Sequence, residues 1–416
     1  MTTRAAVAQR AAETAARSAF GRLLSWLAWQ WRDIAAAEDA LSDALVKALE
    51  RWPLDGVPDK PEAWLLAVAR RQLLQVARHD RVRCDPAVTM LLADEDSEEP
   101  SDAFPDARLK LLFVCAHPAI DERVRIPLML QTVLGLQVAD MAPALLMSPA
   151  ALAQRLVRAK QKIRDTGLRF EEPAVDDLPQ RLHHVLEAIY GAFGLGLDAV
   201  DGAEERITSL GPEAKFLCKL VCVLLPNAAE PRGLLAMMTL IDARAAAREP
   251  QPGQFVPLPA QDPQLWDRDA IVVADKLLWE AARLRNPGPF QLEAAIQSAH
   301  CHRLFTGSTP WSGIAQLYAN SNSFYPTLGS RVAGAVATAE AGELEQGLLA
   351  LDAIDASEAG QFQPWWVARA YLLDKRGDVA GALDSYERAI GLTSQSRLRA
   401  HLQKQMQLTA RSVRPT

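Results

Sequence analysis

The spacing of apolar side chains is the feature that most constrains what this chain can fold into. Leu, Ala and other apolar residues recur three and four positions apart along most of the sequence, among Arg, Glu and Gln, and alternating β-branched runs are nearly absent. This period places apolar side chains on one face of an α-helix, whereas a half-buried strand needs a period of two. The sequence therefore predicts an all-α protein.

Length and composition limit what such helices can build. The chain has 416 residues, 49% of them hydrophobic, so two or three domains with cores of their own are expected. No apolar run is long enough to span a membrane, and the N-terminus has no secretory pattern. Five cysteines without paired spacing suit a reducing compartment. We therefore expect a cytoplasmic protein with no membrane partner.

The first helical unit is expected over residues 5–82. Its clearest helix has one apolar stripe, and its other side is acidic and includes Glu38, Asp39 and Asp43. One buried face and one charged face indicate a helix that packs on a small domain and presents carboxylates outward. The stripe consists of Leu41, Ala44, Leu45, Ala48, Leu49 and Trp52.

Two prolines mark the limits of helices in this unit. Proline disfavours helix at the residue before it, so Trp52-Pro53 is expected to end the striped helix. Pro61 is expected to open the next helix, which continues through Arg78. The segment at residues 83–106 is rich in acids and contains prolines and serines, so it cannot bury enough apolar surface to fold. We expect it to be a flexible linker.

A compact second unit, residues 107–170, ends in a helix–turn–helix pattern. One helix is expected over residues 138–146, followed by a turn at Met147-Ser148. Ser148 is a good N-cap and Pro149 a good first residue for the next helix, expected over residues 149–166. Four apolar residues of that helix are expected to face inward: Leu152, Leu156, Ala159 and Ile163.

The remainder, residues 178–410, is expected to form a larger helical domain with a Pro- and Gly-rich break at residues 249–263. Gly342 and Gly377 each separate two helical segments. In the second copy, the spacing of Ala382, Tyr386 and Ala389 resembles that of a tetratricopeptide repeat. An ordinary pair of antiparallel helices fits the same pattern.

Positive charge is concentrated on two helices, although the formal net charge of the chain is −6. Residues 148–170 carry six basic side chains against one acid, and residues 61–83 carry five against two. Two basic helices on either side of an acidic linker suit two separate contacts with a phosphate backbone. Solvated helix faces explain the same charges when these are considered alone.

In a helix–turn–helix, the first residues of the second helix point at base edges in the major groove of DNA. Gln154 can bond adenine and Arg155 can bond guanine, whereas Arg158 and Lys162 are expected to meet phosphates. An ordinary αα-hairpin fits the local pattern too. The residues expected to contact the duplex are Ser148, Ala150, Ala151, Gln154, Arg155, Arg158 and Lys162.

Patterns for catalysis and metal binding are weak. His300-Cys301-His302 are adjacent, so from one helix they cannot all point at a single ion. Cys218 and Cys222 lie one turn apart among leucines, as buried apolar residues do. The sequence has no P-loop, dinucleotide-binding glycine motif or nucleophile elbow. We therefore expect no metal, no cofactor and no enzymatic activity.

Five motifs occur along the chain in a recognisable order. They are AEDALSDAL with RWP at residues 37–53, GVPDKPEAWL at 56–65, CAHP at 115–118, AQRLVRAK at 153–160 and GPFQLEAAI at 288–296. The first two resemble region 2 of bacterial RNA polymerase sigma factors of the extracytoplasmic-function type. The others resemble region 4 and the long C-terminal extension of a subgroup with tetratricopeptide-like repeats, as do residues 370–388. The resemblance covers nearly the whole chain.

The sequence departs from that family at four places, and one of them is the sparse basic run at residues 79–83, after the helix that begins at Pro61. Ser42 stands where members usually have Gln, and Gln75 where they commonly have Asp. Residues 193–197 read FGLGL where members have Phe-Asn-Glu-Gly-Tyr, which replaces two polar groups and an aromatic ring by flexible or apolar residues. These exchanges indicate a divergent member with altered promoter strength or control.

The resemblance implies three α-helical domains: sigma region 2, a region 4 helix–turn–helix domain and a C-terminal tetratricopeptide-like domain. It implies two partners, core RNA polymerase and promoter DNA. Region 2 binds the polymerase through Glu38, Asp39 and Asp43, and region 4 reads the −35 element through the duplex-contacting set given above. The residues implied to read the −10 element are Trp64, Arg70, Arg71, Gln75 and Arg78.

The role of the C-terminal domain is open at this level. The resemblance implies that it regulates transcription and that a regulatory protein binds to it, since helical-repeat surfaces commonly bind partner proteins. The alternative is a sigma-like protein without promoter activity that acts as a tetratricopeptide-type interaction module. The altered residues 193–197 and the sparse basic run after the second helix favour that alternative slightly.

Overall fold

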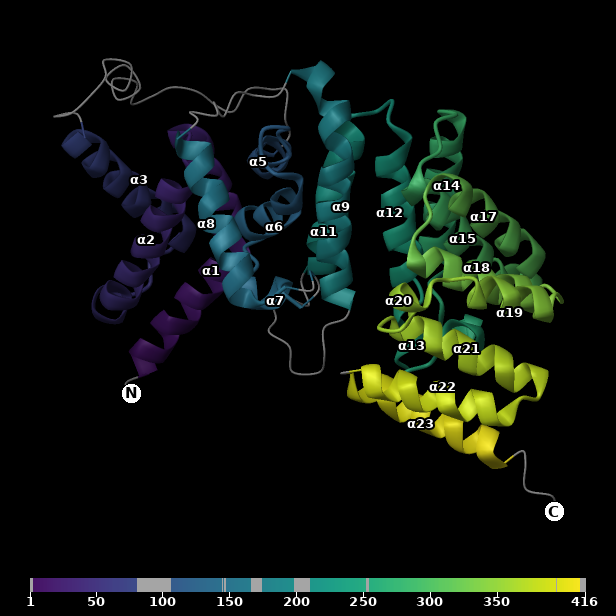
Figure 1. Ribbon diagram of the computed structural model, residues 1–416. Helices are drawn as coiled ribbons and strands as arrows, with labels where there is room; N and C mark the ends of the chain where they lie inside the picture. The colour runs from purple at the N-terminus through teal and green to yellow at the C-terminus, as the bar shows by residue number, and fades with distance from the viewer. Residues whose placement is uncertain are drawn as a thin grey trace. The chain divides into compact units, whose positions relative to one another are not determined.

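The computed structural model is helical throughout the part of the chain that it describes (Figure 1). It describes residues 3–80, 106–143, 145, 147–165, 174–197, 210–251, 254–393 and 395–411. No strand occurs among these residues, so the all-α prediction is confirmed. None of the helices described is both long and apolar enough to cross a lipid bilayer. Contacts divide the chain into unit 1, up to Leu224, and unit 2, from Leu225.

Unit 1 begins with three helices that pack on one another and continues with a second group in which α9 packs on α5 and α6 (Figure 1). Its helices are α1 (Thr3–Trp31), α2 (Ile34–Asp55), α3 (Pro61–Asp80), α5 (Ala107–Cys115), α6 (Glu122–Thr132), α7 (Val138–Met141), α8 (Pro149–Asp165), the 3₁₀ turn η1 (Val175–Asp177), α9 (Leu178–Leu197) and α11 (Leu210–Leu224).

The apolar stripe of α2 is narrower than the sequence predicts. Leu41, Ala44, Ala48 and Trp52 are buried, but Leu49 is exposed. The prediction that Trp52-Pro53 ends this helix was wrong. Pro53 lies in the last turn, and the helix ends only at Gly56, whose φ of +93° favours glycine and whose N–H donates to Trp52 O at 3.0 Å.

The first helix of the predicted helix–turn–helix is shorter than expected. Instead of residues 138–146, α7 covers Val138–Met141. Pro143 explains the difference, because a proline ring clashes with the carbonyl four residues earlier and has no N–H to donate.

The second helix agrees with its prediction. Ser148 Oγ accepts the N–H of Ala151 at 3.3 Å and caps α8, which then runs from Pro149 to Asp165. Leu152, Leu156 and Ile163 are buried, and Ala159 is half-buried.

The boundaries around this second group differ from those expected. The predicted linker at 83–106 lies outside the described residues except for Asp106, which caps α5 by accepting the N–H of Arg108 at 2.8 Å. The C-terminal domain was expected to begin at residue 178, but the contacts place α9 and α11 within unit 1.

Unit 2 is also helical, and the expected break at residues 249–263 follows its short helix α13 and contains the 3₁₀ turn η2. Its elements are α12 (Ala229–Asp242), α13 (Ala245–Arg248), η2 (Leu258–Ala260), η3 (Pro263–Leu265), α14 (Arg268–Arg283), α15 (Pro289–Cys301), α16 (Arg303–Thr306), α17 (Trp311–Phe324), α18 (Leu328–Glu340), α19 (Leu344–Asp352), α20 (Ala356–Ala359), α21 (Gln363–Arg376), α22 (Val379–Leu392) and α23 (Ser396–Arg411).

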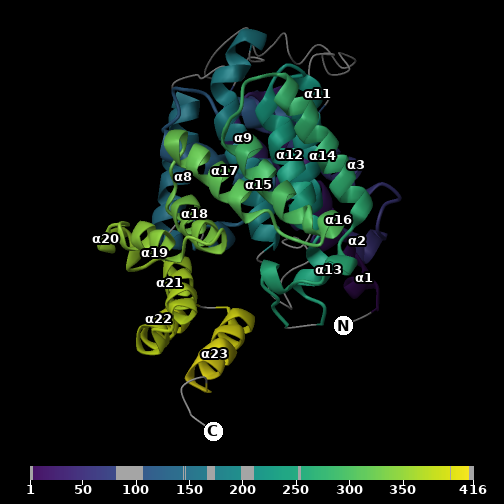
Figure 2. The same ribbon diagram turned by 90° about the vertical axis from the view of Figure 1, so that its right-hand side faces the viewer.

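Two helical hairpins stand where the sequence predicts a repeated pair, α18 with α19 and α21 with α22 (Figure 2). Gly342 and Gly377 turn the chain between their helices at φ values of +105° and +86°, which favour glycine. A shared apolar core joins the hairpins, and the indole N–H of Trp365 donates to Leu351 O at 3.0 Å within it. Three residues expected on the second hairpin's core side are buried: Ala382, Tyr386 and Ala389.

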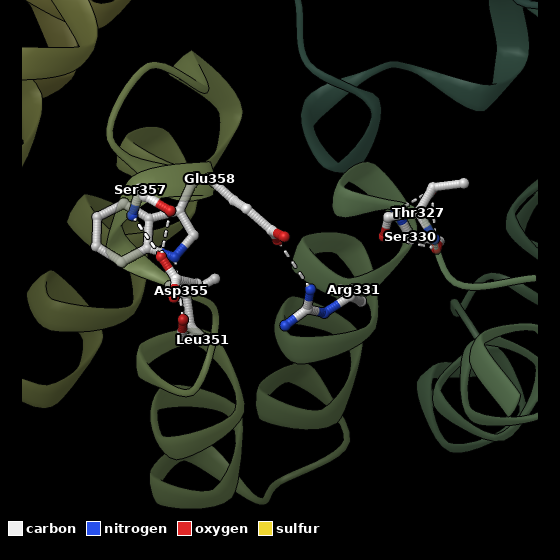
Figure 3. Close-up of polar contacts among 8 residues, drawn as sticks. Thr327, Ser330, Arg331, Leu351, Asp355, Ser357 and Glu358 are labelled. Atoms are coloured by element: carbon white, nitrogen blue, oxygen red, sulfur yellow. Dashed lines mark hydrogen bonds and ion pairs between the residues drawn. The ribbon is translucent and has the colours of Figure 1, made fainter.

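Polar contacts fix the ends of the first hairpin (Figure 3). Thr327 and Ser330 cap the start of α18, where the Thr327 hydroxyl accepts the N–H of Ser330 at 3.0 Å. Arg331, one residue further, pairs with Glu358 of α20 at 3.2 Å. The short helix α20 is therefore tied to α18 as well as to the chain on either side of it.

Candidate functional site

The helix α8 is the centre of the candidate site because its predicted contact residues share an exposed surface. The buried residues Leu152, Leu156 and Ile163 hold the helix against the rest of unit 1 and leave the other side open. All seven residues predicted to contact a duplex are exposed: Ser148, Ala150, Ala151, Gln154, Arg155, Arg158 and Lys162.

An open pocket of about 370 Å³ lies between α8 and α6. Arg155, Arg158 and Lys162 line it from α8, where their spacing of three and four residues puts them on one side of the helix. Arg123 lines it from the start of α6. The sequence analysis missed Arg123, because this residue precedes the helix–turn–helix pattern and no local signal joins it to α8.

The pocket has one acidic residue and an apolar floor. Asp121 is the N-cap of α6, and its carboxylate accepts the N–H of Arg123 at 3.0 Å. Ile120, Val124 and Ile163 form apolar lining between the charged groups. Basic side chains around a shallow apolar floor suit an anionic ligand better than a cationic one.

A different side of α8 is docked on α2. Lys160 pairs with Glu38, and these side chains are only 12% and 26% exposed. Arg164 Nε donates to Asp33 Oδ2 at 3.0 Å, and Asp33 also caps α2 by accepting the N–H of Ala36. Lys160 and Arg164 are thus paired with acids of α2, whereas Arg155 and Arg158 lie on the side of α8 that lines the pocket.

The three acidic residues predicted to bind polymerase also differ in their surroundings. Glu38 is paired with Lys160, whereas Asp39 and Asp43 are exposed. Asp43 accepts a hydrogen bond from the Gln72 amide of α3, which in turn accepts one from Lys47 at 3.2 Å. Asp39 and Asp43 are therefore exposed, and Glu38 is half-buried in its ion pair.

The residues predicted to read a −10 element lie along α3. The ring of Trp64 packs edge-on against buried Trp52, with centroids 5.5 Å apart, so Trp64 has a structural contact. Arg70 is half-buried, and Arg71 and Gln75 are exposed. Arg78 lies in the last turn of α3, and its side chain lies outside the described residues.

Close packing joins the two helical groups of unit 1. A Cβ added to Gly21 of α1 would lie 1.8 Å from the carbonyl oxygen of Val133, just after α6, so no other residue fits there without movement. The Lys110 ammonium, almost fully buried, lies 4.8 Å from the ring centroid of Trp29. These contacts, with the α8–α2 ion pairs, make one body of the two groups.

The first helices of the C-terminal region pack onto α5 and α6. Arg181 of α9 is buried, and its guanidinium donates to Phe113 O at 3.2 Å, near the end of α5. Arg108 of α5 pairs with Glu213 of α11 and with its own neighbour Asp106. Phe193, at the start of the altered FGLGL stretch, is fully buried at the end of α9. This region therefore helps to build the body that carries α8.

The histidines and cysteine of residues 300–302 are packed in unit 2. His300 lies edge-on to Trp311, with ring centroids 5.4 Å apart, and burial lowers the pKa of this histidine to about 4. Cys301 is buried. Within the described ranges, no group of three or more His, Cys, Asp or Glu side chains is arranged to hold a metal ion.

Comparisons with known proteins give a family but no activity. A family of unknown function, DUF6596, matches residues 181–282, which run from α9 of unit 1 to α14 of unit 2. A protein of Rhizobium meliloti (strain 1021), named "Uncharacterized protein R00370", is 33% identical over 395 residues, which are 93% of this chain and 92% of that protein. No solved structure matches the chain at a significant level.

Proposed function

The chain belongs to the same family as the uncharacterized Rhizobium meliloti protein R00370, and we propose that it is a sigma factor of the extracytoplasmic-function type. It binds core RNA polymerase and directs transcription from promoters that have matching −10 and −35 elements. The chain itself catalyses nothing, since the polymerase performs the chemistry. One observation carries the proposal: α8 follows a short helix and a turn, and exposes seven predicted contact residues together with a basic pocket.

The geometry of α8 supports a role in duplex binding. Phosphate contacts position a protein on DNA, and contacts with base edges select the sequence. Gln154, near the start of α8, is exposed and suits a base edge, whereas Arg158 and Lys162 lie one and two turns further and suit phosphates. In the same proposal Asp39 and Asp43 bind the polymerase, and the exposed Arg71 and Gln75 of α3 contact the −10 strand.

Unit 2 is proposed to be a regulatory domain of tetratricopeptide-like type. The two hairpins with their shared core support this idea, because stacked helix pairs commonly present binding surfaces to partner proteins. The helices α9 and α11, which belong to unit 1 and precede unit 2 in the chain, pack on α5, and α9 also packs on α6; these contacts support a link between the C-terminal region and region 4.

Run-off transcription tests the proposal. The full-length protein is added to core RNA polymerase with fragments of the host genome, and discrete transcripts that need the protein are expected. The double variant Gln154→Ala with Arg158→Ala should lose these transcripts, whereas Arg10→Ala, an exposed arginine of α1, should keep them. A protein that gives no transcript from any fragment would instead fit the alternative, an interaction module without promoter activity.

A further inference from the structure

The pocket between α6 and α8 is a basic concave surface of unit 1. Four basic side chains and one carboxylate line it, a local balance of +3 in a chain whose formal net charge is −6. The basic groups come from two helices: Arg123 from α6, and Arg155, Arg158 and Lys162 from α8. An anion in the pocket would therefore be contacted from both sides.

Two neighbouring residues of α8 that were both expected to contact bases, Gln154 and Arg155, differ in whether they line the pocket. Arg155 lines the pocket in the same row as Arg158 and Lys162. Gln154 is exposed but does not line it, and neither do Ala150 and Ala151. Consecutive residues of a helix point in directions about 100° apart, so Gln154 and Arg155 face different parts of a bound duplex.

We propose that this pocket holds a backbone phosphate of the DNA duplex, with Arg123 as a phosphate contact and Arg155 acting with it rather than as a reader of guanine. The inference rests on the proposed function and deepens it, because it changes which side chain of α8 sets sequence preference. Gln154 and the small residues before it then read the bases, and the Arg155 side chain clamps the strand from the α8 side.

The duplex is favoured over a free phosphate compound as the source of the anion. The basic lining residues are exposed and the pocket is open, whereas sites for small ligands usually enclose most of the ligand surface. The base-facing residues of α8 lie directly beside the pocket, so a strand backbone that follows the edge of the groove would pass over it.

The test uses the full-length chain and short duplexes. One duplex is selected from a random pool by the unaltered protein, and others carry single base changes. Dissociation constants are measured by fluorescence anisotropy at several salt concentrations. The variants are Arg123→Ala, Arg155→Ala and Gln154→Ala, and Arg10→Ala is the matched control, since that exposed arginine lies on α1.

Arg123→Ala and Arg155→Ala are each expected to weaken all duplexes by the same factor. Loss of one phosphate contact should reduce the slope of log K against log salt by about 1, which is about fourfold in affinity over a fourfold range of salt. The order of preference among base changes should stay as in the unaltered protein. Gln154→Ala should alter that order and leave the slope unchanged.

Three results would overturn the inference. The first is an Arg123→Ala protein that behaves like Arg10→Ala. The second is an Arg155→Ala protein that loses preference at one base pair. The third is inorganic pyrophosphate that binds in calorimetry and loses its site in Arg123→Ala, while duplex binding does not change. In all three cases the unaltered protein still binds DNA and the proposed function stands. A chain that binds no duplex at all contradicts the function itself.

Discussion

Two sides of α8 carry basic side chains, but one side lines a pocket and the other packs against acidic residues of α2. Arg155, Arg158 and Lys162 surround an open pocket, whereas Lys160 and Arg164 are paired with acids of α2. The basic residues of one helix therefore do not all have the same role. Part of the positive charge of α8 attaches the helix to α2, and the proposed function assigns the charge at the pocket to DNA.

The same distinction applies to all of unit 1. Some helix faces pack against other helices and are called occupied here, and others are exposed to solvent and are called open. The occupied faces are those of α5 and α6 under α9, of α1 at Gly21, and of α2 at Glu38. The open faces include Asp39 and Asp43 on α2 and the pocket side of α8. Changes at occupied faces should alter folding, and changes at open faces should alter binding.

The largest effect is expected from removing α9. A fragment that ends after Pro173 lacks α9. It therefore exposes the surface that packs against four fully buried side chains of this helix: Val185, Leu186, Ile189 and Phe193. At roughly 1.5–3 kcal/mol for each, the loss approaches the whole stability of a domain. We expect this fragment to be expanded or aggregated in size-exclusion chromatography.

A fragment that ends after Leu224 keeps α9 and α11 and provides the control. It should melt cooperatively, with helicity measured by circular dichroism in proportion to its length. Equal melting curves for the two fragments would show that α9 is dispensable to unit 1. The longer fragment also tests unit 2, since promoter output equal to that of the intact chain would leave unit 2 without a regulatory role.

The second effect concerns the open acids of α2. Reversing Asp39 and Asp43 together to Lys should abolish binding to core RNA polymerase without unfolding, because both side chains are exposed. Glu38→Lys should reduce binding much less, because Glu38 is engaged with Lys160. Affinity is measured by titration of labelled protein with core enzyme. Equal losses for the two changes would remove the distinction between open and paired acids.

The third effect compares two helical glycines. Gly21→Ala forces a Cβ against the carbonyl of Val133, and we expect a loss of about 1–3 kcal/mol in the free energy of unfolding. Gly191→Ala in α9 meets nothing within 4 Å, so the better helix propensity of Ala should stabilise the protein by about 0.5–1 kcal/mol. Urea denaturation measures both, and a shift of the same sign would contradict the close packing of α1.

The smallest effect concerns the ion pair between α8 and α2. A double-mutant cycle on Lys160→Ala and Glu38→Ala should give a coupling of about 1 kcal/mol in unfolding free energy, since the pair is largely shielded from water. Lys162→Ala, two residues away on the pocket side, should change unfolding by less than about 0.5 kcal/mol. A coupling that vanishes in low salt would mean that α8 is not docked through this pair.

Features encoded by neighbouring residues could be predicted from the sequence. The row Leu152, Leu156 and Ile163, the Ser148 cap and the turns at Gly342 and Gly377 each depend on side chains within a few positions of one another. The extent of helices near proline was less predictable. The helix α2 continues past Pro53 to Asp55, whereas α7 ends at Met141, before Pro143.

Contacts between distant parts of the chain could not be predicted, because no pattern among neighbouring residues marks them. Lys160 and Glu38 lie 122 positions apart, and nothing in either helix marks it as the other's partner. Arg123 has no place in the helix–turn–helix pattern and joins α8 only when α6 folds beside it. The packing of α9 on α5 and α6 could not be predicted for the same reason, since the pattern of an amphipathic helix does not show which surface it will cover.

The thiol of Cys115 has a consequence for the kinetics of unit 1. It is fully buried at the end of α5 and lies 3.7 Å from the Thr132 hydroxyl, whose own proton goes to Leu128 O. Burial raises the pKa of the thiol to about 12, so at neutral pH the reactive thiolate is essentially absent while α5 and α6 stay together. Modification by a thiol reagent must therefore wait for a transient separation of these helices. The rate of alkylation at this one sulfur measures how often the body that carries α8 comes apart.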